Sequence, residues 1–266
     1  MIRRSSMVAM AIFLGLSTIA QAFCQEAEPP MPNYKLNRAD EDYRYLQKGP
    51  RRDLWDPVKY IPFNNRGDWY LSLGGEARER YEYFDNFNWK EESTRDNGYA
   101  LQRYFLHGDV HLGDDVRVFG QFQSSLENGR AGGPRPSIDK NELDLHQGFL
   151  DLRLPLSENE SITLRSGRQE LLYGSQRLIA VREGPNVRQA FDGFRVMYRS
   201  GPVAVDGIAT RPVESNKYVF DDETDHKQGL WGVYSVLPLP SATKANTDLY
   251  YLGLYRSHSV YDQGAA

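Results

Sequence analysis

The chain has little cysteine and, beyond its first twenty residues, no long hydrophobic run. Cys24 is the only cysteine among 266 residues, so no disulfide can form within the chain. The mean hydropathy is negative, and no later apolar run approaches the ~20 residues that a transmembrane helix needs. These absences exclude a disulfide-stabilised scaffold and a helical membrane protein.

The one apolar run belongs to a pattern typical of export signals. Arg3 and Arg4 give a basic start, an apolar stretch covers residues 7–20, and a small-x-small motif ends at Ala22. Such a run is too short to span a bilayer and has the layout of a signal peptide. We therefore expect residues 1–22 to be a signal peptide that is cleaved after Ala22.

Lysine is scarce compared with arginine. Of the 32 basic residues, 24 are arginine and 8 are lysine, and residues 153–211 contain nine arginines and no lysine. The planar guanidinium binds carboxylates through two parallel hydrogen bonds and stays charged in any surroundings. This bias suits a path for a carboxylate-bearing substrate, although surface charge or ion pairs inside a barrel would produce it equally well.

From Trp69 onward, apolar and polar residues alternate with a period of two, which predicts β-strands with two unlike faces. In the first strand, Leu71 and Leu73 fall on the apolar parity, and Glu76 and Arg78 fall on the polar one. About nine strands are expected. They are predicted near residues 69–83, 103–112, 116–123, 143–154, 161–173, 190–200, 202–213, 228–238 and 247–258.

The connections between these strands alternate in length. The long polar loop 127–141 lies between two short connections, at 113–115 and 155–160. Outer-membrane barrels show this alternation, and Tyr81 and Tyr83 near a strand end suit a membrane interface. We predict an all-β fold, a transmembrane antiparallel β-barrel of the outer-membrane type. A soluble β-sandwich remains the alternative, because its strands alternate in the same way.

The region before the strands is different in character. Residues 23–68 are rich in Pro, Asp, Arg and Tyr and lack sustained periodicity, apart from a possible short helix over residues 40–46. We expect an N-terminal lead-in segment over 23–68, on the periplasmic side or across part of the barrel mouth. The barrel domain is expected over residues 69–266.

Several strings resemble the alginate export family of outer-membrane porins. They occur in order at residues 41–46, 73–82, 144–152, 167–179 and 191–195, and the resemblance covers most of residues 38–214. It implies a monomeric barrel of roughly eighteen strands in the outer membrane, whose arginine-rich lumen passes an alginate-like polyuronate out of the cell. With about nine strands before Ala266, we expect roughly half of such a barrel, from a truncated product or an incomplete sequence.

An arginine that faced lipid at the membrane midplane would cost ~2–4 kcal/mol, so strand arginines should face the lumen. Around residues 167–170 the alternation slips, which leaves open whether Arg165 or Arg168 points inward. The expected counter-charges, which would hold the guanidinium groups in place, are Glu76, Asp151, Glu170 and Asp192. The expected substrate-path residues are Arg78, Arg80, Arg103, Arg117, Arg153, Arg168, Arg195 and Arg211.

Other functions are weighed beside this one. A general or uptake porin for small anions or sugars would use the same architecture. A barrel hydrolase is less favoured: Asp144 and His146 share a strand face, but no Gly-x-Ser-x-Gly motif supplies a nucleophile. His107 and His111 stand ~13 Å apart along a strand, too far for one metal ion.

No enzyme activity, catalytic residue, cofactor or metal is therefore expected. The expected partners are an anionic polysaccharide, outer-membrane lipid and a periplasmic secretion scaffold, with no nucleic acid.

Overall fold

The computed structural model describes residues 34–257 except 50, 52, 85–96 and 240–244. The expected signal peptide, 1–22, lies outside the described residues. The chain divides into two units, residues 1–36 and 37–266. The second unit contains every helix and strand of the described residues.

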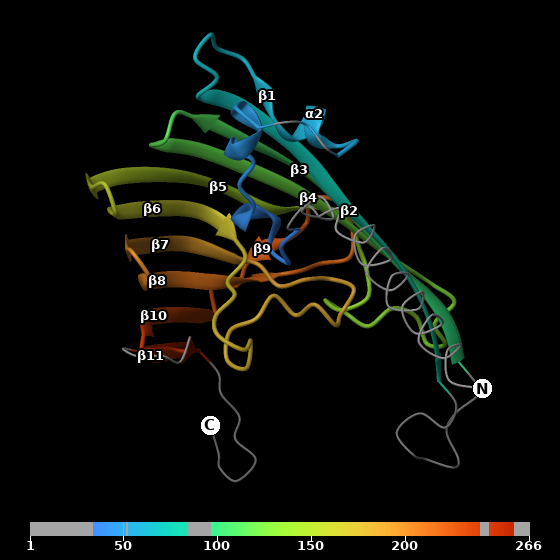
Figure 1. Ribbon diagram of the computed structural model, residues 1–266. Coiled ribbons are helices and arrows are strands. Elements are labelled where there is room, and N and C mark those ends of the chain that lie inside the picture. Colours follow the sequence, from blue (N-terminus) through green and yellow to red (C-terminus); the bar gives the residue numbers. More distant parts are fainter. Residues whose placement is uncertain (1–33, 50, 52, 85–96, 240–244, 258–266) are drawn as a thin grey trace, which may run out of the picture. The chain divides into compact units, whose positions relative to one another are not determined.

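This unit is built around one antiparallel sheet in which strands that are consecutive in the sequence are neighbours (Figure 1). Its nine long strands have between 10 and 17 residues, enough for the ~9–11 residues that a membrane-spanning strand requires. They are β2 (Trp69–Phe84), β3 (Asn97–Leu112), β4 (Val116–Asn128), β5 (Asn141–Ser157), β6 (Glu160–Gln169), β7 (Phe191–Ser200), β8 (Val203–Glu214), β10 (Gln228–Pro238) and β11 (Asn246–Arg256).

Two strands of two residues complete the sheet. β1 (Ile61–Pro62) pairs with β2, and β9 (Glu223–Thr224) pairs with β8. The sheet does not close on itself among the described residues. The prediction of an all-β fold of the outer-membrane barrel type is confirmed.

Short helical turns precede the sheet: η1 (Arg38–Asp40), η2 (Arg44–Gln47) and α2 (Asp56–Lys59). The single helix predicted over residues 40–46 is wrong, because residues 41–43 are not helical. The Asp42 carboxylate accepts a hydrogen bond from the Arg44 backbone N–H at 2.9 Å. Such a bond from a backbone N–H to a nearby Asp side chain competes with the hydrogen bonding of a continuous helix.

The two ends of the sheet carry connections of different length. At one end, short turns join β3 to β4, β5 to β6 and β7 to β8, and Gly113 and Gly201 adopt positive φ angles of +71° and +52° there. Glycine occupies this region without the steric cost that other residues meet. At the other end lie the connections 129–140, 170–190 and 215–227. Outer-membrane barrels place short turns on the periplasmic side and long loops outside.

The two faces of the sheet are inverted relative to those of a water-soluble protein. The exposed face carries large apolar side chains, including Leu106 (64% exposed) and Leu154 (60%), whereas Arg103 on the opposite face is fully buried. A soluble sandwich would bury the apolar parity and expose the polar one. A broad exposed apolar surface is unfavourable in water and is typical of the lipid-facing side of a barrel, so we expect the outward face to contact lipid.

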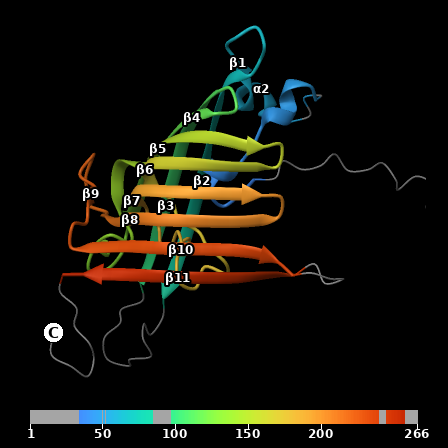
Figure 2. The same cartoon turned by 90° about the vertical axis from the view of Figure 1, so that its left-hand side faces the viewer.

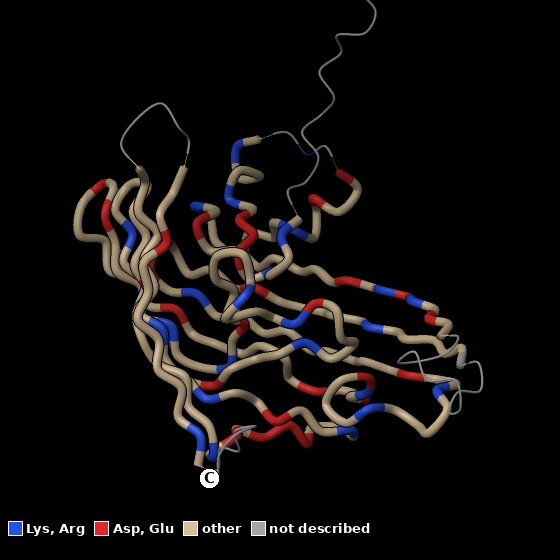
Figure 3. Tube along the Cα trace, turned by 90° about the horizontal axis from the view of Figure 1, so that it is seen from below, with Lys and Arg blue, Asp and Glu red and all other residues tan. Residues whose placement is uncertain are grey.

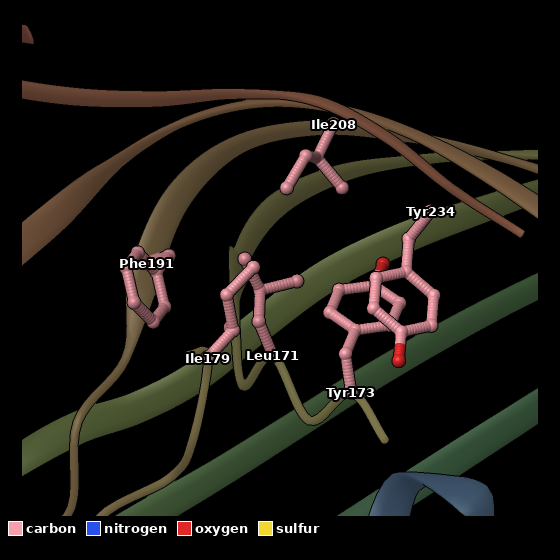
Figure 4. Close-up of a cluster of buried hydrophobic side chains, with 6 residues drawn as sticks. All are labelled: Leu171, Tyr173, Ile179, Phe191, Ile208 and Tyr234. Carbon is pink, nitrogen blue, oxygen red and sulfur yellow. The ribbon is translucent and has the colours of Figure 1, made fainter. Parts of the chain in front are cut away.

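Two segments lie against the other, concave face of the sheet, as Figures 1 and 2 show: the described part of residues 37–60, which leaves out 50 and 52, and the β6–β7 connection, residues 170–190. The second segment is held by a buried apolar cluster (Figure 4). Leu171, Tyr173 and Ile179 from the connection pack there against Phe191, Ile208 and Tyr234 of β7, β8 and β10. The concave side is therefore partly filled by the chain itself.

Among the described residues, none of the helices is both long and apolar enough to cross a bilayer.

If the outward face contacts lipid, the cost in stability of a charge introduced on it should depend on how deep the charge lies in the membrane. Leu150 and Leu154 share the outward face of β5, and Leu154 lies nearer the short-turn end. We expect Leu150→Arg to lower the free energy of unfolding in lipid vesicles by ~2–4 kcal/mol and Leu154→Arg by ~0–1 kcal/mol, because the cost of a charge falls toward the interface. Urea titration followed by tryptophan fluorescence measures both, and equal costs would contradict the assignment of this face to lipid.

Candidate functional site

Basic and acidic residues recur along the strands and their connections (Figure 3). The register shows which of them share a face, because directly paired residues on neighbouring antiparallel strands point the same way. One such row crosses the concave face from β2 to β8. It consists of Tyr70, His111, Arg117, Asp151, Arg165, Arg195 and Ile208.

Within this row the guanidinium groups are bonded to carboxylates. Arg117 binds Asp109 through two hydrogen bonds of 2.8 Å, and Arg165 binds Asp151 at 2.7 and 2.8 Å. Both are fork-to-carboxylate pairs, the strongest arrangement for these groups. Arg165 is 3% exposed, so the bond to Asp151 compensates a charge almost withdrawn from solvent.

Arg165 directly faces Arg195 on the next strand, an unfavourable pairing of like charges. Asp206 of β8 relieves it, because its carboxylate accepts hydrogen bonds from Arg195 at 3.0 Å and Arg199 at 2.6 Å. The Tyr173 hydroxyl donates to the same carboxylate at 2.9 Å. Burial raises the pKa of Tyr173, so this hydroxyl remains a protonated donor.

A second cluster occupies the part of the concave face nearer the long connections. Arg78 and Arg103 are direct cross-strand neighbours, again two cations side by side. Glu183 of the β6–β7 connection reaches both: its carboxylate lies 3.2 Å from Arg78 and accepts a hydrogen bond from Arg103. The Glu76 carboxylate accepts a hydrogen bond of 2.9 Å from the same Arg103 nitrogen, Nη2.

Arginines of β2 also bind backbone carbonyl groups of the β6–β7 connection. Arg78 donates to the carbonyl oxygens of Glu183 (2.9 Å) and Pro185 (3.0 Å), and Arg80 donates to that of Gly184 (2.8 Å). Asn186, which is fully buried, continues this attachment with hydrogen bonds to three backbone carbonyls. Residues 183–186 are thereby fastened to β2, β3 and β4.

Glu170 begins the same connection and is 1% exposed. Its two carboxylate oxygens bind different partners, Arg188 at 2.7 Å and the His146 ring at 2.7 Å. Asp144, which we expected to share a strand face with His146, accepts a hydrogen bond from the Asp222 backbone N–H at 3.0 Å. The two side chains thus have separate partners.

The N-terminal segment joins this network as well. Arg38 lies 2.8 Å from Glu41 and 3.2 Å from Glu76 of β2. Burial alone would lower the pKa of Arg38, but its bonds to these carboxylates raise it. Arg117 donates to the Ala39 carbonyl oxygen at 2.7 Å. Residues 37–41 therefore lie directly against charged groups of the concave face.

The predicted path residues divide between the two faces. Six lie on the concave face: Arg78, Arg80, Arg103, Arg117, Arg153 and Arg195. Arg168 and Arg211 lie on the other face, in one row with Gly148 and the expected counter-charge Asp192. The other three counter-charges, Glu76, Asp151 and Glu170, are bonded to arginines of the concave side.

The alternation of apolar and polar residues is interrupted near residue 168 because a charged residue, Arg168, lies on the outward face. Arg165 faces the concave side, and Arg168, three residues on, faces outward at the long-connection end of β6. Its charge is matched there by Asp192 at 2.9 Å, which also accepts a hydrogen bond from Thr224 of β9 at 2.7 Å. Gly167, at φ +131°, lies so close to Gly148 that a Cβ atom would collide with the backbone.

Several members of the network were missed from the sequence. Arg199, Asp109 and Asp206 lie on the concave face of regular strands, so their parity could have identified them. Glu183 and Arg188 lie in a connection without periodicity, and no pattern in the sequence indicated that it returns to the concave side.

A cavity of about 370 Å³ opens near the short-turn end of β3, β4 and β5. Its lining includes Asp40 and Arg44 of the N-terminal segment, Arg117 of β4, and Asp151 and Arg153 of β5. The Arg153 side chain has no hydrogen bond or ion pair with any of the described residues. It is the path candidate whose charge is least compensated.

Because Arg103 is paired with carboxylates and Arg153 is not, replacing each by Gln should change the free energy of unfolding by different amounts. Arg103→Gln leaves Glu76 and Glu183 without their shared cation, and we expect a loss of roughly 3–5 kcal/mol in unfolding free energy, typical of a broken buried ion pair. Arg153→Gln removes an uncompensated charge and should change it by less than about 0.5 kcal/mol. Urea unfolding of both variants in detergent measures the difference, and coinciding transitions would refute the pairing described for Arg103.

Comparison with known proteins agrees with this architecture. The family model described as "Alginate export" matches residues 69–263. No curated protein and no solved structure matches the chain. The match covers most of the chain and the nine long strands, and its family consists of outer-membrane transport channels rather than enzymes. The chain belongs to the alginate export family.

Proposed function

We propose that the protein passes a polyuronate such as alginate through the outer membrane along an arginine-lined lumen formed by the concave face. The observation that carries this proposal is the separation of charge between the faces: apolar side chains face outward, and six of the eight predicted path arginines face inward. A chain of carboxylates would meet guanidinium groups along the wall, each able to bind it through a fork.

The proposed path favours release as well as binding. Asp109, Asp151 and Asp206 lie beside the inward arginines and weaken the field that a substrate carboxylate meets. A conducting pore needs sites that bind an ion well enough for entry and weakly enough for exit. Arg153 at the cavity and Arg199, whose side chain is 41% exposed, are the proposed contact points for the substrate.

The proposal includes the organisation of the chain. Residues 1–22 would direct export, residues 23–68 would form a lead-in segment, and residues 69–266 would form the barrel domain, whose first long strand begins at Trp69. Outer-membrane lipid would contact the outward face. A periplasmic secretion scaffold would meet the short-turn end.

A porin for small anions or sugars is the second candidate. The observation that favours it is the extent of pairing: Arg103, Arg117, Arg165 and Arg195 are all bonded to carboxylates, which reduces the net positive charge of the wall. The two candidates differ in whether a long polyuronate binds in the lumen.

Conductance of the full-length protein in planar bilayers separates them. We expect polyuronate oligomers to block the current and neutral oligosaccharides of equal length to have no such effect. Arg153→Glu should weaken the block about tenfold, because it reverses a charge at the cavity within a Debye length of the substrate. Arg211→Glu, on the outward face, makes the same change in net charge and should leave the block unaltered.

If anion selectivity falls in Arg153→Glu but polyuronate never blocks, the small-anion porin is the better description. If Arg211→Glu and Arg153→Glu weaken the block equally, the position of the path on the concave face is refuted.

A further inference from the structure

The end of β5 lacks a neighbour from β6. The last β5–β6 pair is Gly148 with Arg168, whereas β5 extends back to Asn141. Residues 141–147 of β5 therefore have no partner in β6. Unpaired strand edges are costly, above all near lipid, where water cannot satisfy backbone groups. This edge of β5 needs a partner from elsewhere in the chain.

A short part of the β8–β10 connection supplies that partner. The Glu142 backbone N–H donates to the Lys217 carbonyl oxygen at 3.1 Å. The Phe220 N–H donates to the Leu143 carbonyl oxygen at 2.9 Å. Leu143 and Val219 form a parallel bridge. The connection therefore extends the sheet beside β5 over these few residues.

This part of the connection exposes three consecutive large side chains. Tyr218, Val219 and Phe220 are 61%, 52% and 61% exposed. Their backbone is held in place, because the Tyr218 N–H donates to the Asp221 carboxylate at 3.0 Å and Phe220 keeps a φ angle of +53°. A bulky residue rarely adopts that angle, and such conformations persist only where the surroundings enforce them. Exposed apolar side chains on an ordered backbone indicate an interaction surface.

The surface continues the outward face of the sheet. Leu106 of β3 and Phe122 of β4 are directly paired and share that face. Both line an outward groove of about 370 Å³, together with Leu143 and Phe220. The Phe220 ring meets the Phe122 ring edge-on, with 6.2 Å between their centroids. The connection thus extends the apolar outward face toward the long-connection end.

The acidic side of the same connection turns the other way. The Asn141 Nδ2 atom lies 2.9 Å from both carboxylate oxygens of Asp222, and the Asp222 N–H donates to the Asp144 carboxylate at 3.0 Å. The register pairs Asp144 with Gln123 and places it, like Asn141, on the concave side. The connection therefore separates apolar from acidic groups as the strands beside it do.

One cation stands at the start of this surface. Lys217 is exposed, and its ammonium group forms no ion pair or hydrogen bond with any of the residues that the structure describes. Its Nζ atom lies 5.7 Å from the centre of the Tyr218 ring. A lysine beside an apolar surface can cover it with its stem while the ammonium group reaches a lipid phosphate.

We propose that residues 217–220 lie in the membrane, with Val219 and Phe220 among the acyl chains of the lipid and Lys217 at the level of its phosphates. A connection of this length would otherwise extend into water. An acyl chain suits the groove because large apolar side chains line it. The inference rests on the proposed contact of the outward face with lipid, and it holds whichever solute crosses the lumen.

Spin labelling of the full chain tests this position in vesicles of phosphatidylethanolamine and phosphatidylglycerol. A nitroxide is attached to Val219→Cys, with Cys24→Ser to remove the native thiol. Its collision rate with O₂, which concentrates in hydrocarbon, is compared with that for a water-soluble nickel chelate. We expect O₂ to dominate at residue 219, as at Leu106→Cys on the strand face, and the two rates to be closer at Lys217→Cys. The chelate should dominate at Lys227→Cys, the matched control in the same connection, which is exposed and lies outside the groove.

Two results separate failure of this inference from failure of the lipid contact on which it rests. If the chelate dominates at residue 219 while O₂ dominates at Leu106→Cys, the connection lies in water and the proposal is overturned, although the strands still contact lipid. If the chelate dominates at both, the whole outward face is wrongly assigned. Low rates with both reagents at residue 219, as a protein contact would give, also overturn the proposal. Phe220→Cys replaces Val219→Cys if the latter loses the heat-dependent gel mobility of the folded chain.

Discussion

The structure depends on one constraint: guanidinium groups that face one another on the concave side of the sheet must be matched by carboxylates. Large apolar side chains are exposed on one face of the sheet, and the polar parity of the strands turns to the concave one. There, regular pairing brings cations of neighbouring strands face to face, as in Arg78 with Arg103 and Arg165 with Arg195. These contacts are tolerable only because acidic side chains stand beside them.

Part of the required negative charge comes from outside the sheet. The β6–β7 connection returns to the concave side, where Glu183 bridges Arg78 and Arg103 and Glu170 binds Arg188. Its apolar residues pack against β7, β8 and β10, so hydrophobic contact and ion pairing hold the same segment (Figure 4). Because β6 ends at Gln169, the chain that follows it occupies part of the concave side, and residues 217–220 bond to the end of β5 that β6 does not reach.

The pairing also bears on transport through a channel of this family. Fully compensated arginines shape the wall but offer little free charge, whereas uncompensated or exposed ones can exchange partners with a passing anion. Arg153 at the cavity and the exposed Arg199 differ in this respect from the buried Arg103. In the function proposed above, a path made of a few accessible cations within a paired network would bind each carboxylate weakly, which suits movement along a pore.

By itself, the sequence determined the strands and their two faces. Period-two alternation from Trp69 predicted nine long strands, because neighbouring side chains on a strand must point to opposite sides. Seven agree with their observed bounds within four residues, whereas β3 begins six residues earlier and β4 ends five residues later than expected. The ordered strings at 73–82 and 144–152 indicated the family that the match over residues 69–263 then established. The parity of β2 and β3 was enough to place Arg78 and Arg103 on one face.

Only the tertiary structure decided which charges meet. Arg168 and Arg211 were expected inside but face outward, where Arg168 binds Asp192 of β7 and Arg211 donates to the His226 carbonyl oxygen of the β8–β10 connection. Glu183 and Arg188 lie in a connection without periodicity, where no local pattern indicates which strand the chain will return to. Alternation is a property of neighbouring residues, whereas ion pairing between distant segments depends on how the whole chain folds back on the sheet.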